Sequence, residues 1–217
     1  MLPLSRPEAL SLLREWVVSE SLRRHMLAVE AAMRAYAQRF DEDQELWGQT
    51  GLLHDLDYER YPDLATGHPR HAVAELRRLG YPEVLVRGVA SHADFMGVPR
   101  ESSMELTLFA VDELCGFISA CAYVRPAGIA GMTPKSVNKK VKQPSFAAAI
   151  SREDLRRGAE GLRIGLDEHV AFVICALQPS AHELGLEGRG SDAQATRPAG
   201  GAAGPSAGAT PSAGEAT

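Results

Sequence analysis

Apolar residues recur three and four positions apart along most of the chain, which is the period of an α-helix. In the segment 21–40, Leu22, His25, Met26 and Val29 fall on one such stripe. The stripe places His25 among side chains that we expect to be buried. No segment shows the alternation of apolar and polar residues that is typical of a strand. The pattern therefore predicts an all-α protein.

Proline and glycine residues indicate where the helices begin and end. Pro69 suits the first turn of a helix that stops at Gly80, and Pro82 begins the next helix. The pattern and these breaks together predict helices at about 7–20, 21–40, 43–56, 69–80, 82–92, 103–124, 152–161 and 167–177. The same reasoning predicts loops at 57–67 and 126–134.

The composition changes at the C-terminal end of the chain. Residues 187–217 contain seven Gly, three Pro and no apolar side chain larger than Ala. Such a segment cannot bury a hydrophobic core. We therefore predict a disordered tail rich in Gly, Ala, Ser and Pro at 187–217. The remaining residues, 1–186, are expected to form one folded domain, because their number suits a single core.

The formal net charge of the chain is -5. A mildly acidic protein is not expected to coat DNA or RNA in bulk, because that function needs a basic face. No apolar run approaches the roughly 20 residues that span a bilayer, and the N-terminus has no basic region followed by an apolar run. The three cysteines lie in apolar stretches, so we expect buried thiols in a reducing compartment. We predict a soluble cytoplasmic protein without a membrane partner, and its oligomeric state stays open.

Six residues with potential metal-ligating side chains lie near predicted helix ends or on apolar helix faces. They are His25, His54, Asp55, His68, His92 and Asp112. Buried imidazoles and carboxylates without compensation are costly, and a metal cation converts that cost into binding. Neutral imidazole together with carboxylate suits first-row divalent ions. The adjacent pair His54-Asp55 lets one backbone segment supply two ligands, and a carboxylate can bridge two ions.

The order of these six residues resembles the HD-domain superfamily of metal-dependent phosphohydrolases. The segment from Gly51 to Asp57, with the sequence GLLHDLD, carries the most specific part of the resemblance. Asp112, on a long apolar helix, is similar to the closing aspartate of that family. The resemblance covers about residues 20–125. It implies an HD-domain-like helical bundle around a metal site.

The resemblance also implies a set of ligands. A first divalent ion would be held by His25, His54, Asp55 and Asp112. A second ion would be held by His68 and His92, with Asp55 as the bridge. His54 and Asp55 would be the catalytic pair. Two-metal members often have a further histidine at the position of Ala93, so the number of ions, one or two, and their identity among Mn, Mg, Fe, Co, Ni and Zn stay open.

Such a site predicts an enzyme that hydrolyses a phosphate ester, because a bound cation lowers the pKa of water and neutralises charge on phosphoryl oxygens. The expected substrate is a nucleotide, a dinucleotide or another small phosphorylated molecule. Two alternatives stay open. One is a di-iron oxygenase of the same superfamily, and the other is a catalytically inactive domain that binds a nucleotide as a sensor.

A phosphate ester also needs cations beyond the metal ions. We expect them from a basic segment that follows a loop rich in Gly and Pro, and from one arginine before that loop. The expected substrate-binding residues are Arg125, Lys135, Lys139, Lys140 and Lys142. The competing interpretation of the segment is a solvated basic face.

The remaining histidines and one aspartate have simpler expectations. His169 is expected in the core, whereas His71 is expected near the site or exposed, and His182 is expected to be exposed. Asp57 could orient a ligand or a water molecule, as carboxylates beside metal ligands often do.

Overall fold

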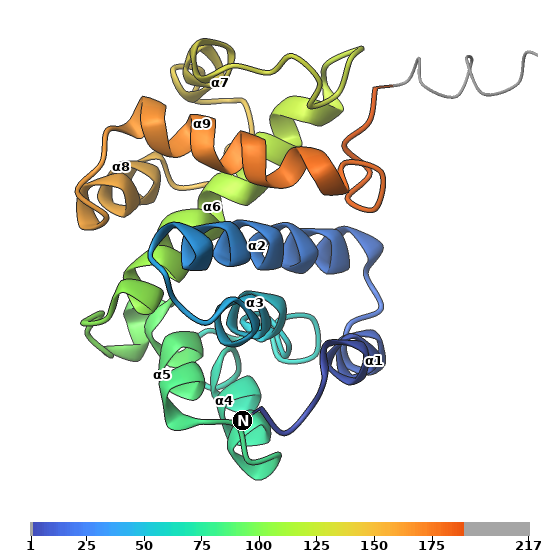
Figure 1. The fold of residues 1–217 in the computed structure, drawn as a ribbon, viewed down its shortest axis with the longest axis vertical. Coiled ribbons are helices and arrows are strands. Elements are labelled where there is room, and N and C mark those ends of the chain that lie inside the picture. Colours follow the sequence, from blue (N-terminus) through green and yellow to red (C-terminus); the bar gives the residue numbers. More distant parts are fainter. Residues whose placement is uncertain (1, 189–217) are drawn as a thin grey trace, which may run out of the picture.

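The computed structural model describes residues 2–188, which form a bundle of helices without a strand (Figure 1). In chain order the helices are α1 (Arg6–Trp16), α2 (Glu20–Arg39), α3 (Gln44–Leu53), α4 (Arg70–Arg78), α5 (Glu83–Ser91), α6 (Ser103–Tyr123), α7 (Pro134–Val141), α8 (Arg152–Gly161) and α9 (Leu166–Leu177). Two 3-10 turns, η1 (Asp94–Met96) and η2 (Gln178–Ser180), complete this part of the chain. The all-α prediction is confirmed for these residues.

The eight helices expected from the sequence are all present, and the largest shift of a single boundary is at the end of α1. This helix was expected to continue to about residue 20, but it ends at Trp16. The carboxylate of Glu59 accepts hydrogen bonds from the backbone N–H groups of Val18 and Ser19, both at 2.9 Å. A contact with a distant loop therefore holds the chain in a non-helical conformation, which local periodicity does not reveal.

Helix α7 was not expected, because its sequence was interpreted only as a basic segment. Its first turn has a clear local cause. The side chain of Thr133 accepts a hydrogen bond from the backbone N–H of Ser136, and Pro134 occupies the first helical position.

Residues 189–217, which make up nearly all of the predicted tail, lie outside the described residues. Glu187, which the prediction placed in the tail, pairs with Gly128 in an isolated antiparallel β-bridge. Leu184 and Leu186, just before it, are buried. The chain thus stays packed against the loop that follows α6 almost to the last described residue.

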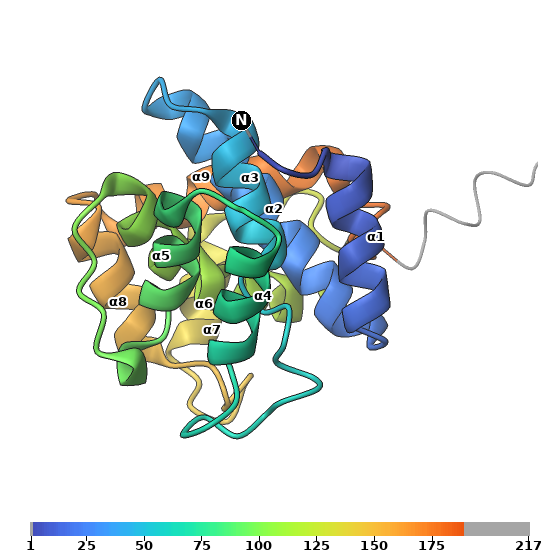
Figure 2. The ribbon, with the colours of Figure 1, turned by 90° about the horizontal axis from the view of Figure 1, so that it is seen from below.

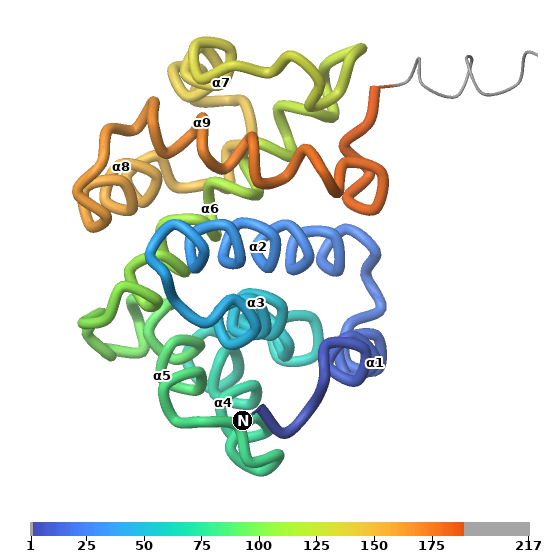
Figure 3. Tube along the Cα trace, viewed as in Figure 1, coloured from blue at the N-terminus to red at the C-terminus, as the bar shows by residue number. Residues whose placement is uncertain are grey.

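Two apolar clusters form the core, and α2 contributes to both (Figures 1 and 3). One cluster lies between α2, α6 and the C-terminal helices α7, α8 and α9. The other joins α1, α3, α4 and α5, and it includes Met26 from α2. Seen from below, α4 and α5 lie side by side in front of α6 (Figure 2). Helix α2 therefore lies between two halves of the bundle.

Helix α6 is the longest of the helices and contacts α2, α5, α8 and α9. Among the described helices it alone is long and apolar enough to cross a bilayer, although the sequence analysis expected no such run. Within the most apolar stretch of this helix, 56% is buried inside the molecule. Its apolar composition therefore matches its place at the centre of the bundle.

Helices α2 and α3 pack unusually closely at Gly51. A Cβ atom at this position would lie 2.9 Å from Cγ of Met33 and 3.0 Å from the backbone carbonyl of Val29. Only glycine allows this approach without a shift of the helices. The close contact brings the C-terminal end of α3, with His54, near His25 on α2.

Candidate metal centre

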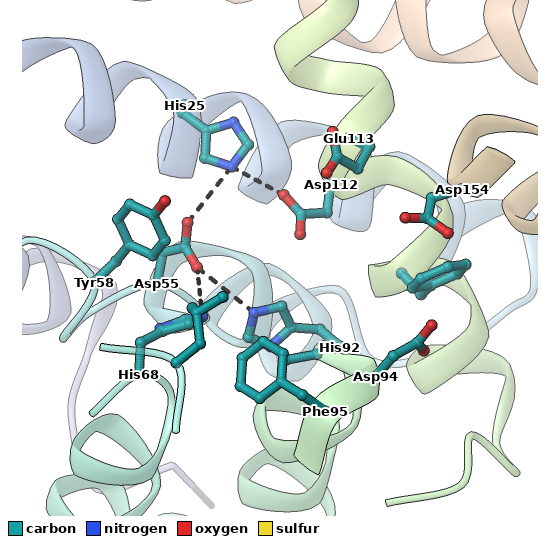
Figure 4. Close-up of a pocket in the computed structure, with 13 residues that line it drawn as sticks. His25, Asp55, Tyr58, His68, His92, Asp94, Phe95, Asp112, Glu113 and Asp154 are labelled. Carbon is teal, nitrogen blue, oxygen red and sulfur yellow. Dashed lines mark ion pairs between the residues drawn. The ribbon is translucent and has the colours of Figure 1, made fainter. Parts of the chain in front are cut away.

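His25 and Asp112 face each other across the contact between α2 and α6 (Figure 4). Nε2 of His25 lies 3.0 Å from Oδ1 of Asp112 and 3.9 Å from Oδ2 of Asp55. The side chain of His25 is 22% exposed, because the stripe on which it lies turns toward the interior. The structure therefore brings these residues together, as the sequence analysis expected.

His54 and His92 are positioned in the same way at the ends of two helices. Each residue is the C-cap of its helix, α3 or α5. Nδ1 of His54 donates to the carbonyl of Gly51 at 2.8 Å, and Nδ1 of His92 donates to the carbonyl of Val89 at 2.6 Å. Carbonyls in the last turn of a helix lack an intrahelical donor, so the two rings satisfy them. Because a carbonyl only accepts, Nδ1 of each ring carries a proton, and in the neutral form of the ring the lone pair is on Nε2.

His68 is held by a buried carboxylate instead of a helix end. Its Nδ1 donates to Oδ1 of Asp57 at 2.8 Å, and the other oxygen of Asp57 accepts from the backbone N–H of Ala72 on α4 at 2.8 Å. Asp57 is fully buried. The expectation that Asp57 orients a neighbouring ligand agrees with this geometry. Helix α4 begins just after His68, with Pro69 as the N-cap rather than in the first turn.

Asp55 lies between two pairs of histidines, His25 with His54 and His68 with His92, and each of its oxygens faces one pair. Figure 4 shows its ion pairs with His25, His68 and His92. Oδ2 lies 3.5 Å from Nε2 of His54 and 3.9 Å from that of His25. Oδ1 lies 3.5 Å from Nε2 of His68 and 3.6 Å from that of His92. The two groups could each hold an ion and would share this carboxylate.

The fit of a cation to this centre can be tested on the atoms themselves. Nε2 of His54 is buried and has no hydrogen-bond partner, although it lies 3.4 Å from Oδ1 of Asp112 and 3.5 Å from Oδ2 of Asp55. A nitrogen lone pair that faces two carboxylates is repelled unless a positive charge lies between them. Imidazole nitrogen with carboxylate oxygen is a donor set that suits first-row divalent ions. The residues present therefore fit a metal ion.

The ionisation of the site follows from burial and from the short distances between its charges. Burial lowers the pKa of His54, but Asp55 and Asp112 outweigh this effect and raise it to about 9. Burial also raises the pKa of Asp112, but His54 and His25 hold it well below its ordinary value. In the absence of an ion, His54 is therefore protonated, and its positive charge offsets the negative charge of the two carboxylates.

The metal centre forms the floor of a pocket of about 490 Å³ (Figure 4). Beyond the ligands, its walls come from four parts of the chain: the loop after α3, the turn η1, α6 and α8. These walls are lined by Tyr58, Leu64, Ala93, Asp94, Phe95, Phe109, Glu113 and Asp154. The volume suits a small organic ligand.

The structure does not bring the expected substrate-binding cations to this pocket. None of its lining residues is a lysine or an arginine. The guanidinium of Arg125 instead donates to the carbonyls of Gly128 and Ala130 in its own loop. Arg125 follows the C-terminal end of α6, and a rise of about 1.5 Å per residue puts Tyr123 roughly 16 Å along the helix axis from Asp112.

The lysines lie still further along the chain, on or directly after α7. Helix α7 packs mainly against α9 and makes fewer contacts with α6. Lys135, Lys139 and Lys142 are exposed, and Lys140 lies with its Nζ 4.7 Å from the ring centroid of Phe146. This placement agrees with the competing interpretation of a solvated basic face.

The other histidines lie outside the centre. His169 is buried in the core, where its Nε2 donates to the carbonyl of Ala110 and its Nδ1 accepts from the hydroxyl of Tyr36. His71 is exposed and stacks on Tyr61, and His182 is exposed. These placements agree with the expectations for all three.

Several lining residues had no role in the sequence analysis. Phe95 and Asp154 are examples, because neither residue belongs to a motif that the sequence shows. The expectation for the cysteines was wrong at one position: Cys115 and Cys121 are buried, but Cys175 lies on the exposed side of α9.

Comparison with known families agrees with this geometry. The family model described as the HD domain matches residues 22–115, which run from the start of α2 to the middle of α6 and include all six residues of the centre. No curated protein and no solved structure matches the chain. The match over residues 22–115 is consistent with a member of the HD-domain superfamily, whose members are in general metal-dependent phosphohydrolases. Helix α1 and the helices from α7 to α9 lie outside the matched segment.

Proposed function

We propose that this protein is a metal-dependent phosphohydrolase that cleaves a small phosphate ester. The observation that carries the proposal is Asp55, whose two oxygens each face a separate pair of histidines at the floor of an open pocket. When bound there, one or two divalent ions would neutralise charge on a phosphoryl oxygen and lower the pKa of the attacking water. The partner would be a small phosphorylated molecule, and the cytoplasmic location stays a prediction.

The chain's own residues would orient the ligands and keep them in the correct protonation state. The carbonyls of Gly51 and Val89 hold the protons of two histidines on Nδ1, and Asp57 does the same for His68. Each Nε2 is thereby free to bind a cation. His54 is fully buried and Asp55 faces both pairs of histidines, so we propose them as the residues on which turnover depends most.

The test is a phosphate-release screen over nucleotides, dinucleotides and sugar phosphates, repeated with Mn, Mg, Fe, Co, Ni and Zn. We expect release with at least one ion, and we expect Asp55→Ala to remove nearly all turnover and most bound metal. Asp41→Asn, which changes an exposed carboxylate in the loop before α3 at a φ of 56° that asparagine tolerates, is the control and should behave as the wild type. Full metal content in Asp55→Ala by elemental analysis would show that the ligand assignment is wrong.

A second experiment addresses the number of ions. Of the two groups, the one with His68 and His92 has no second aspartate, so its ion should be the more weakly held. His92→Ala should therefore lose about one ion per chain and stay folded, whereas His54→Ala should lose more. Equal loss in both variants would mean that the ions bind as a unit or that only one is present.

The same metal analysis separates the alternatives. Two irons per chain in protein purified without added metal, with oxygen consumption and no phosphate release, would identify a di-iron oxygenase. Tight binding of a nucleotide without turnover, whichever ion is added, would identify a sensor domain. The hydrolase is preferred because the site offers candidate ligands at all six positions and an open pocket above them.

A further inference from the structure

The mouth of the pocket carries an unusual concentration of exposed apolar side chains. Within residues 2–188, Tyr58 is 46% exposed, Leu64 49% and Phe95 45%. All three line the pocket above the metal centre. Exposed apolar groups that gather around a concave site indicate a surface that a ligand covers.

The two aromatic rings are held next to the metal ligands. The ring of Tyr58 makes an edge-to-face pair with His68, with 5.1 Å between centroids, and the ring of Phe95 makes another at 6.4 Å. The backbone N–H of Tyr58 donates to the carbonyl of Asp55 at 3.0 Å, so this ring cannot move far from the bridging carboxylate. Both rings keep nearly half of their surface free, and Figure 4 shows them near His68.

The charge of the opposite wall restricts the ligand further. Asp94, Glu113 and Asp154 line that wall, and the lining contains no lysine or arginine. The guanidinium groups of Arg100 and Arg157 lie 2.5 Å and 2.7 Å from the oxygens of Asp94, and Arg157 also pairs with Asp154 at 2.8 Å, so both are engaged by carboxylates. One phosphate could be neutralised at the metal centre, but a second phosphate would meet no lysine or arginine in the lining.

We propose that the substrate is a monophosphate ester of an alcohol that carries a flat ring, with the ring against Tyr58 and Phe95 and the single phosphate at the metal centre. This inference rests on the proposed phosphohydrolase function and names the class of substrate for that site. The volume of about 490 Å³ accommodates a ring system, a short linker and one phosphate. Stacking on aromatic side chains is tolerant of the ring's identity, so the site selects a shape rather than one compound.

The test compares adenosine 5′-monophosphate with ribose 5-phosphate, which share the same primary-alcohol leaving group and differ by the ring system. With the metal-loaded wild type, we expect kcat/KM to be higher for the ring-bearing substrate by roughly tenfold or more. Tyr58→Ala and Phe95→Ala should each reduce this ratio severalfold, whereas Tyr58→Phe should keep it. Tyr123→Ala removes a ring that is 49% exposed at the far end of α6, and it should leave the ratio unchanged.

Adenosine 5′-triphosphate tests the charge of the wall, and its kcat/KM should be at least tenfold below that of the monophosphate. Equal kcat/KM for the two monophosphates would contradict the binding of the ring against Tyr58 and Phe95, but not the hydrolase function. Faster phosphate release from the triphosphate than from the monophosphate would overturn the selection for a single phosphate. No release from any of these esters or from the wider screen, with any ion, would overturn the hydrolase function and this inference with it.

Discussion

At the scale of single residues, the centre is organised by the Nδ1 atoms of its histidines. Three of them donate this proton to a neighbour that can only accept: the carbonyl of Gly51, the carbonyl of Val89 or the carboxylate of Asp57. This fixes the tautomer of the neutral ring, so that each Nε2 can offer a lone pair to a cation once the ring is neutral. The neighbours of the ligands are thus as important to the chemistry as the ligands themselves.

The first prediction concerns Asp57. In Asp57→Asn the amide can still accept from His68, but its NH2 group then meets the backbone N–H of Ala72, where a donor faces a donor. Loss of a carboxylate behind a ligating histidine typically weakens metal binding about 10–100-fold, and we expect that loss here by isothermal titration. Asp41→Asn is the control, because this exposed residue has φ 56°, a conformation that asparagine tolerates. An unchanged affinity in Asp57→Asn would contradict the role of this hydrogen bond.

The second prediction concerns pH. Burial lowers the pKa of His54, but Asp55 and Asp112 raise it to about 9 in the absence of an ion. Since a metal needs the neutral imidazole, binding must release this proton, and the affinity should rise up to tenfold for each pH unit between about 7 and 9. The stability of the metal-free protein should change with pH in the opposite direction. The raised pKa stabilises it fully below about pH 6.5, and that contribution is lost as the pH rises through 9.

Calorimetric titrations at several pH values, in buffers with different ionisation enthalpies, measure both the affinity and the number of protons released. An affinity that does not change between pH 7 and 9 would contradict the proton balance proposed for His54.

At the scale of elements, helix packing decides whether the ligands meet. His25 comes from α2, Asp112 from α6, and His54 and His92 from the ends of α3 and α5. At Gly51 α3 approaches the backbone of α2, and the carbonyl of Gly51 also holds the ring of His54. A small displacement of α3 would therefore change both the distance to α2 and the direction of this ring.

The third prediction follows from that contact. In Gly51→Ala the new Cβ would lie 2.9 Å from Cγ of Met33 and 3.0 Å from the backbone of Val29, so the two helices must separate. We expect a loss of about 1–3 kcal/mol in the free energy of unfolding, which is typical of overpacking, together with weaker metal binding. Chemical denaturation and metal analysis measure the two effects.

The control is Gly116→Ala on α6. Its Cβ would meet only Cδ1 of Ile150 at 3.4 Å, an ordinary contact. Alanine in place of a helical glycine should then be neutral or stabilise the protein by about 0.4–1 kcal/mol. If Gly51→Ala behaved in the same way, the close approach of α2 and α3 would not be what positions His54.

At the scale of the whole molecule, the centre connects segments that are far apart in the sequence. Its ligands span positions 25 to 112, and α2 and α6, which carry the outermost two, also hold the C-terminal helices in the core. An ion that binds this folded arrangement but not the unfolded chain must stabilise the entire bundle.

The fourth prediction is a metal-dependent melting temperature. At a free ion concentration 100 times the dissociation constant, the folded state should gain about 2.7 kcal/mol, and the gain should continue to increase with concentration. Differential scanning calorimetry with chelator and then with increasing ion would measure it. Asp55→Ala should lose most of this response, while Asp41→Asn should retain it. A melting temperature that does not depend on the ion in the wild type would show that no metal binds at the centre.

The sequence alone was enough to interpret the spacing of the apolar residues and the chemistry of six side chains. Periodicity over about ten to twenty residues reports local geometry, so it identified eight helices and placed His25 on a buried stripe. The set of imidazoles and carboxylates indicated a cation, because their cost of burial does not depend on the details of the fold. The role of Asp57 was also accessible, since it lies two residues after Asp55.

The tertiary structure alone decided the surroundings of that centre. The positions of Phe95 and Asp154 in the pocket, and the absence of Lys135 and its neighbours from it, depend on how helices cross and how far each extends. The early end of α1 likewise depends on Glu59, a residue about forty positions away. Sequence spacing carries no information on such contacts, because they are set by the packing of whole elements. Side-chain chemistry therefore pointed to a metal site, whereas helix packing determined which walls a substrate meets there.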